Sequence, residues 1–123
     1  MQGHKELIVR QKPIDLVLTV YKLTKSLPKT EVYGLASQTQ SSAVLVPSNI
    51  TEGPGLKQAQ AYARHLAIAN GSLTELETQL EIARRLGYLM PEDESVIHQA
   101  GEVGRMLAGL RRSLRARLET PES

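Results

Sequence analysis

Arginine side chains near the end of the chain are the residues whose spacing most suggests a chemical role. Five of them lie close together, with no acid between Glu102 and Glu119: Arg105, Arg111, Arg112, Arg115 and Arg117. At about 100° per residue, Arg105 and Arg112 project together from a helix, Arg115 lies beside them, and the other two flank the apolar side. Such a face could bind the phosphates of RNA or DNA, with a steep dependence on salt.

The same cationic face has a simpler interpretation. Cations are favoured near the C-terminus of a helix, and a row of them is often only a solvated surface. No aromatic residue interleaves with the arginines, so stacking on the bases of single strands is not predicted. The sequence leaves both interpretations open, a phosphate-binding face and a solvated face.

Residues suited to metal binding or catalysis do not form a recognisable site. Di-metal bundles use a Glu-x-x-His pair on facing helices, and neither His65 nor His98 has a glutamate three residues before it. The acids of this region have basic residues at helical spacing, which predicts local ion pairs: Glu77 and Glu81, followed by Arg84 and Arg85. The chain has no cysteine, and Ser72 has no triad partners in the pattern. We therefore expect no enzyme activity, no metal and no cofactor.

Asn49 and Glu52 are polar residues beside an apolar seam. They could bind a ligand, but such residues more often satisfy backbone groups at a helix end, here near Pro47. Gly71 lies within a long helical pattern and lowers helix stability by roughly 1 kcal/mol relative to alanine. We expect close contact with a neighbouring helix to offset that cost.

Two apolar runs with spacings of three and four residues determine the expected architecture. One extends from Ala59 to Ala83 and the other from Val96 to Leu118, and such spacing keeps one stripe of a helix against its partners. Breaks at proline and glycine give expected helices at about 12–27, 32–50, 56–86 and 91–118, after a leader at 1–11 that lies over the bundle. The expected fold is all-α, an antiparallel up-down-up-down four-helix bundle with Leu73, Leu76 and Leu80 in its core.

Composition limits the class of protein further. At 123 residues the chain suits one domain spanning 1–123. Apolar residues make up 41% with no Phe and no Trp, which favours close helix packing. No run approaches a membrane span and no signal peptide is recognisable, so we expect a cytoplasmic protein that does not enter a membrane. The net charge of +2 does not by itself indicate a partner.

Four segments together resemble a known family. They are 33–38 (YGLASQ), 43–53 (AVLVPSNITEG), 71–83 (GSLTELETQLEIA) and 86–89 (LGYL), accompanied by Leu7, Val9, Gln11-Lys12 and Leu27-Pro28. Over about residues 5 to 90 the chain is similar to the bacterial four-helix-bundle proteins encoded in intervening sequences of large-subunit ribosomal RNA genes. The resemblance implies an up-down bundle, a ring-like homopentamer and no enzyme activity.

A distant branch of this family, the accessory proteins of diversity-generating retroelements, binds nucleic acid and a reverse transcriptase through a basic surface. This chain departs from the family pattern because positions that are often basic are uncharged here: Gln40, Ser41, Pro54, Leu56 and Asn70. An aromatic residue is also replaced by Arg10. If this chain binds nucleic acid, the resemblance leaves only the arginines between 105 and 117 to do so.

We expect a non-enzymatic homo-oligomer, a pentamer by the resemblance, that is a nucleic-acid-associated module binding RNA or DNA. Apolar residues outside the helical seams also favour an interface between chains: Leu7, Ile8, Val9, Leu89 and Met90. Two alternatives remain, a structural scaffold that binds a protein partner without nucleic acid and a bundle that binds a small molecule in its interior.

Overall fold

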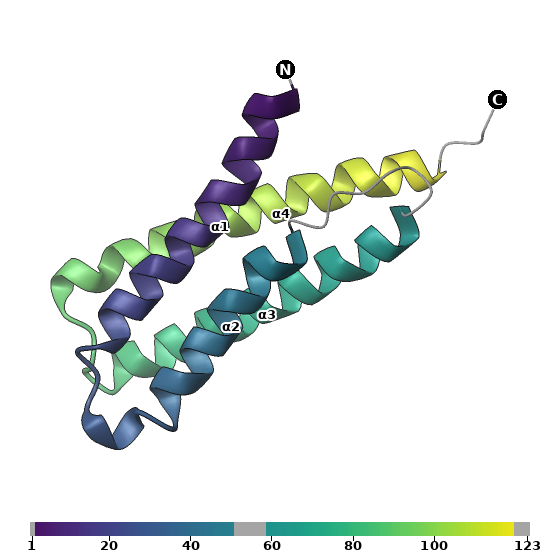
Figure 1. Ribbon diagram of the computed structural model, residues 1–123. Helices are drawn as coiled ribbons and strands as arrows, with labels where there is room; N and C mark the ends of the chain where they lie inside the picture. Colours follow the sequence, from purple (N-terminus) through teal and green to yellow (C-terminus); the bar gives the residue numbers. More distant parts are fainter. Residues whose placement is uncertain (1, 51–58, 120–123) are drawn as a thin grey trace.

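The computed structural model describes residues 2–50 and 59–119, with side chains from Leu7 onward. Four α-helices make up most of it, joined by two short 3₁₀ turns (Figure 1). The helices are α1 (Gln2–Thr24), α2 (Leu35–Ile50), α3 (Ala59–Arg85) and α4 (Ser95–Glu119), and the turns are η1 (Lys29–Glu31) and η3 (Pro91–Glu94). The described residues contain no strand, which confirms an all-α four-helix bundle.

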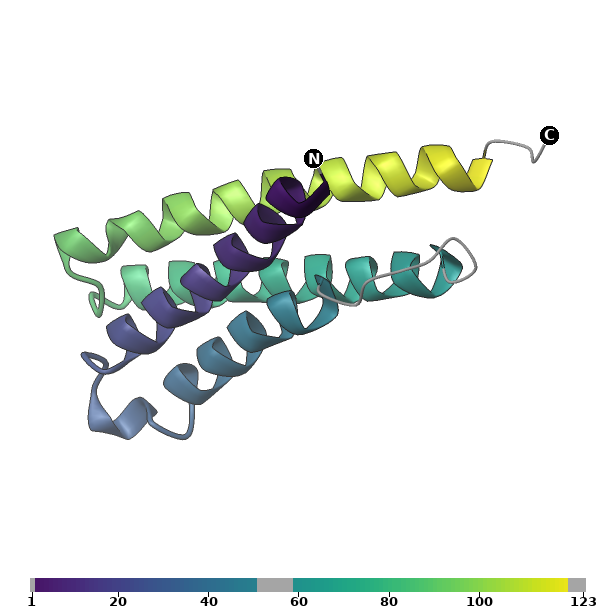
Figure 2. The same cartoon turned by 45° about the horizontal axis from the view of Figure 1, so that its top comes forward.

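Each helix packs against two neighbours. α2 lies between α1 and α3, while α4 contacts α3 and α1. Figures 1 and 2 show consecutive helices running in opposite directions, so the start of α3 lies beside the end of α4. In both views α2 ends before the first turns of α3, and the first turns of α1 project away from the bundle in Figure 1. The α3–α4 pair therefore continues beyond α2 at one end.

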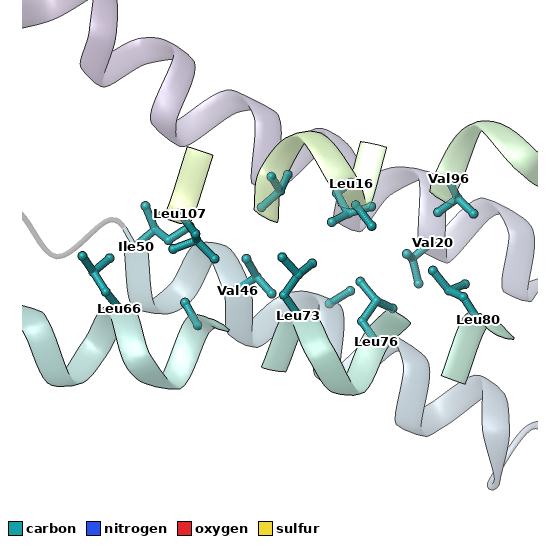
Figure 3. Packing of buried hydrophobic residues seen from close by; sticks show 14 of the residues in the cluster. Leu16, Val20, Val46, Ile50, Leu66, Leu73, Leu76, Leu80, Val96 and Leu107 are labelled. Atoms are coloured by element: carbon teal, nitrogen blue, oxygen red, sulfur yellow. The ribbon is translucent and has the colours of Figure 1, made fainter. Parts of the chain in front are cut away.

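Aliphatic side chains from all four helices fill the core (Figure 3). The predicted core residues Leu73, Leu76 and Leu80 are 2%, 0% and 2% exposed, which confirms their placement. α3 and α4 approach closely at Gly104, where an added Cβ would lie 3.4 Å from Leu73 Cδ2. A core of leucine, valine, isoleucine and alanine is dense because helices with small contact residues can approach in this way.

The expected leader at 1–11 is wrong where it is described. α1 begins at Gln2 and continues through Pro13, rather than beginning near residue 12. Proline inside a helix removes one backbone hydrogen bond, but the Pro13 ring is fully buried and Val9, one turn earlier, packs against the core. The apolar area that these side chains remove from water offsets the missing bond.

The other helix ends differ from the predictions by a few residues. α1 ends at Thr24, and α2 begins at Leu35, whose N–H donates to Glu31 Oε1 at 3.1 Å. This carboxylate therefore satisfies a free donor of the first turn of α2, which explains the later start. The expected start of α3 at residue 56 lies outside the described residues.

The connection from α3 to α4 is well defined. α3 ends at Arg85, Gly87 adopts a positive φ of 81°, and the Tyr88 N–H donates to the Ala83 carbonyl at 2.9 Å. This is the glycine-terminated helix end that the sequence predicts. The predicted helical turn at 91–94 is a 3₁₀ turn, and α4 follows it from Ser95.

Gly71 contradicts its predicted role. It is exposed, and an added Cβ would meet no other atom within 4 Å. The close contact with a neighbouring helix that we expected there is found at Gly104 instead. Among the described residues, no close contact at Gly71 offsets the cost of this glycine.

Candidate nucleic-acid interface

The five arginines of α4 form what we call the arginine face: Arg105, Arg111, Arg112, Arg115 and Arg117. Leu107 and Leu114 are 0% and 4% exposed, so they anchor this half of α4 to the bundle. The helical period then turns the intervening positions toward solvent. Four of the arginines are exposed and Arg111 is partly buried, as expected for a residue beside the buried stripe.

Small residues lie before and between the arginines on the outer side of α4. Gly101, Ala108 and Gly109 are exposed or half-buried. An added Cβ on Gly101 would meet Arg105 Nη1 at 3.5 Å, and one on Gly109 would meet Arg112 Nη2 at 3.9 Å. These two guanidinium groups therefore lie back along the helix, and the surface between the arginines stays low.

The arginine face differs in its electrostatics from the two arginines at the end of α3, Arg84 and Arg85. On α3, Arg84 Nη2 lies 2.6 Å from Glu81 Oε2 and Arg85 Nε lies 2.8 Å from the same oxygen. Hydrogen bonds from Arg84 and then Arg85 lower the pKa of Glu81 to about 2. This confirms the ion pairs predicted from the spacing, apart from Glu77, whose pKa burial raises.

No ion pair within the described ranges involves the arginine face. The acid nearest to it in sequence on its N-terminal side, Glu102, accepts from Lys12 Nζ of α1 at 3.4 Å instead. The arginines therefore keep their positive charges uncompensated in the described structure, whereas Arg84 and Arg85 share a carboxylate.

Arg64 is a further exposed cation that was missed from the sequence. It is exposed on α3, in the part of this helix that lies beside the end of α4 (Figures 1 and 2). Residues 59–74 and 103–118 contain no acid, and α2 contains no charged residue. Among the described residues, the end of the bundle where α3 begins and α4 ends is therefore basic, although α4 finishes on Glu119. The lack of acids in both segments was visible in the sequence, but their adjacency was not.

A polar cluster joins α2 to α3 near this end. Asn49 is 8% exposed, its Nδ2 donates to the Leu45 carbonyl at 2.8 Å, and its Oδ1 lies 2.9 Å from His65 Nδ1. Tyr62 Oη donates to the Ile50 carbonyl at 3.0 Å, and burial raises its pKa. Asn49 therefore bonds a backbone carbonyl of its own helix, but not that of Ala43, which lacks its helical N–H donor because residue 47 is proline. Glu52 lies outside the described residues.

Clusters of possible metal ligands and a surface groove are the other features of the described part of the chain that bear on a binding site. No group of three or more His, Asp or Glu residues there could hold a metal ion. A shallow surface groove has all its lining residues on α3, among them Thr74, Thr78 and Ile82. Because no other element contributes to it, polar groups do not converge there as they do in a ligand pocket.

The fold defines this chain as an all-α four-helix-bundle protein with one basic end. Its residues 5–109 match the model of the 23S rRNA-intervening sequence protein family, and the chain belongs to that family. A comparison with curated proteins gives no match. Measured against the length and hydropathy that a bilayer requires, none of the described helices qualifies as a membrane span.

The limits of the family match bear directly on the arginine face. The match extends into α4, beyond the resemblance at residues 5 to 90, and it ends at residue 109. Arg105 lies inside it, and the remaining four arginines lie after it. The arginine face is therefore a feature of this chain that must be judged on its own chemistry.

Proposed function

We propose that this protein is a non-enzymatic, homo-oligomeric module that binds the phosphate backbone of nucleic acid through the arginine face of α4. The observation that carries the proposal is that the positive charges of the arginine face are not paired with carboxylates of the described residues. Arg105, Arg112 and Arg115 project together from the outer side of α4, and the other two arginines flank its buried stripe. No described carboxylate pairs with any of the five. Guanidinium groups are suited to phosphate because they present several N–H donors in a planar fork.

Assembly would strengthen such binding. A homo-oligomer, a cyclic pentamer in this proposal, repeats the arginine face once in each chain, and linked contacts raise affinity without any new interaction. The net charge of +2 per chain is no obstacle because the five arginines of α4 lie within a stretch, residues 103–118, that contains no acid. Backbone contacts of this kind carry little sequence information.

A binding titration tests the proposal. Labelled structured RNA and duplex DNA are titrated with the protein at about 50 mM and about 200 mM salt, where phosphate contacts differ most in strength. The triple variant Arg105→Glu, Arg112→Glu, Arg115→Glu should lose binding and keep its helical content. The matched control is Lys22→Glu, Lys25→Glu, Lys29→Glu, which changes the net charge equally at exposed positions in the α1–η1 region. If the wild-type protein retains no nucleic acid at the lower salt, the proposal is refuted.

A second candidate function is a scaffold that binds a protein partner without nucleic acid. Its supporting observation lies at the opposite end of the bundle, where Tyr88 Oη donates to Glu31 Oε2 at 3.3 Å and joins the two loop regions. Apolar side chains are exposed around this link: Val32, Tyr33, Leu86 and Met90. Tyr33 is 96% exposed, and exposed apolar groups of this kind often mark interaction surfaces. Absence of nucleic-acid binding in the titration would favour this candidate.

A further inference from the structure

The shape of the α4 surface restricts which kind of nucleic acid the arginine face could bind. α4 is held between α1 and α3 along the bundle, so it presents one side and cannot enter a deep groove as an isolated helix does. Between the arginines the surface is formed by small residues such as Ala108 and Gly109. The result is a low, straight, cationic surface about 15 Å long from Arg105 through Arg112 to Arg115, at 1.5 Å per helical residue.

Single-stranded nucleic acid is a poor match for this surface. Proteins that hold single strands combine basic grooves with aromatic side chains, and each stacked base adds about 1–3 kcal/mol. α4 contains no aromatic residue. Tyr62, on the neighbouring part of α3, is partly buried, and its hydroxyl is bonded to the Ile50 carbonyl. A flexible strand would lose conformational entropy when it is ordered along the arginines, without the base stacking that normally offsets this loss.

A nucleic-acid duplex fits the same surface better than a single strand does. It is stiff over about 150 base pairs, so lying along a straight row of arginines costs it little conformational entropy. Its two strands supply about one phosphate for every 1.7 Å of axis. The small residues between the arginines let the backbone approach closely, and the guanidinium groups that lie along the helix can reach phosphates beside it.

From these observations we propose that the ligand of the arginine face is the paired backbone of a nucleic-acid duplex rather than a single strand. The inference rests on the proposed function and specifies its ligand. The shared chemistry is the double row of phosphates, which both RNA and DNA duplexes supply.

The test compares three probes of equal length by fluorescence anisotropy at about 50 mM salt: an RNA duplex, a DNA duplex and unstructured oligouridine. We expect at least one duplex to bind about tenfold or more tightly than oligouridine. The stacking of one base on an aromatic side chain would be enough to cancel this difference in affinity. Equal or tighter binding of oligouridine would overturn the inference and leave the proposed function intact. Failure of all three probes to bind would refute the proposed function itself.

A matched pair of variants tests the close approach without changing charge. Ala108→Leu adds bulk between the arginines, whereas Ala67→Leu makes the same change at an exposed position of α3. Leucine is nearly as good a helix former as alanine, so circular dichroism should show unchanged helix content in both. We expect Ala108→Leu to reduce duplex affinity toward that of oligouridine and Ala67→Leu to leave it unchanged. Equal duplex affinity in the two variants would overturn the inference.

Discussion

Single residues of α3 show how position decides the effect of a substitution. Leu76 is fully buried, Gly71 is exposed with open space where a Cβ would lie, and Glu81 accepts from two arginines. All three are on one helix, so their intrinsic helix context is similar. The differences in their expected effects therefore come from packing and charge.

Leu76→Ala should lower the free energy of unfolding by about 2–5 kcal/mol, because a leucine at 0% exposure leaves a cavity when it is truncated. Urea denaturation followed by circular dichroism measures the change. The control Thr78→Ala, at an exposed position of α3, should change stability by no more than about 0.5 kcal/mol. A loss below about 1 kcal/mol for Leu76→Ala would remove this residue from the core.

Gly71→Ala should raise the free energy of unfolding by roughly 0.5–1 kcal/mol, because alanine restricts the unfolded chain and its Cβ has room in the helix. Gly87→Ala is the contrasting variant and should lower it, since the φ of Gly87 is 81°. Both changes are measured by the same denaturation experiment. A destabilised Gly71→Ala protein would indicate that a second chain packs at this position.

The Glu81 carboxyl should titrate near pH 2 in the folded protein, below its ordinary pKa of 4.5, because Arg84 and Arg85 donate hydrogen bonds to its charged form. A lowered folded-state pKa means that the stabilisation is present above pH 4.5 and is lost as the pH falls toward 2. NMR titration of the side-chain carboxyl measures the pKa directly. Arg84→Gln should raise it, and an unchanged value would contradict the assigned cause.

At the scale of elements, α4 combines two roles on opposite sides. Its buried side, which includes Val103 and Leu107, belongs to the core, while its outer side carries the arginine face. Substitutions on the outer side can therefore test binding without disturbing the bundle. α2 has no charged residue and packs against α1 and α3.

The salt dependence of duplex binding should report how many arginines neutralise phosphates. If all five of one chain neutralise phosphates, the plot of log K against log salt should have a slope of about −4.5 for each engaged chain. The triple variant Arg105→Gln, Arg112→Gln, Arg115→Gln should reduce this slope to about −1.8. An unchanged slope in the variant would show that the phosphates are bound elsewhere, and the lysine control at positions 22, 25 and 29 should retain the wild-type slope.

At the scale of the whole molecule, charge and apolar surface are unevenly distributed. The basic end carries the arginine face and Arg64. Apolar side chains instead remain exposed along the outer side of α1: Leu7, Ile14, Leu18 and Tyr21. Val9 and Leu89, expected at an interface, pack against the core instead, whereas Leu7, Ile8 and Met90 are exposed. Exposed apolar surface on a helix of this length favours contact with another chain.

Size exclusion with light scattering should give a mass about five times the 13.5 kDa of one chain if the proposed cyclic pentamer forms, since a closed ring satisfies a repeated heterologous contact. Leu18 is 62% exposed, so Leu18→Lys should dissociate the assembly without unfolding the chain. The control Ser37→Lys changes charge equally at an exposed position of α2. A wild-type mass of one chain across micromolar concentrations would refute the oligomer.

The sequence alone determined the helical architecture and the core of this protein. Apolar spacing identified Leu73, Leu76 and Leu80 because the side of a helix that is buried must repeat every three to four residues. The glycine end of α3 and the pairing of Glu81 with Arg84 and Arg85 were also predictable, since both depend on residues within one or two helical turns. The arginine face itself follows from the same local periodicity.

Only the tertiary structure decided the features that depend on neighbouring elements. The continuation of α1 through Pro13 required the burial of its ring against the bundle. The open space at Gly71 and the place of Arg64 beside the end of α4 follow from how α3 and α4 pack. These contacts join residues far apart in the chain, and a local pattern carries no information about which distant side chain will lie opposite.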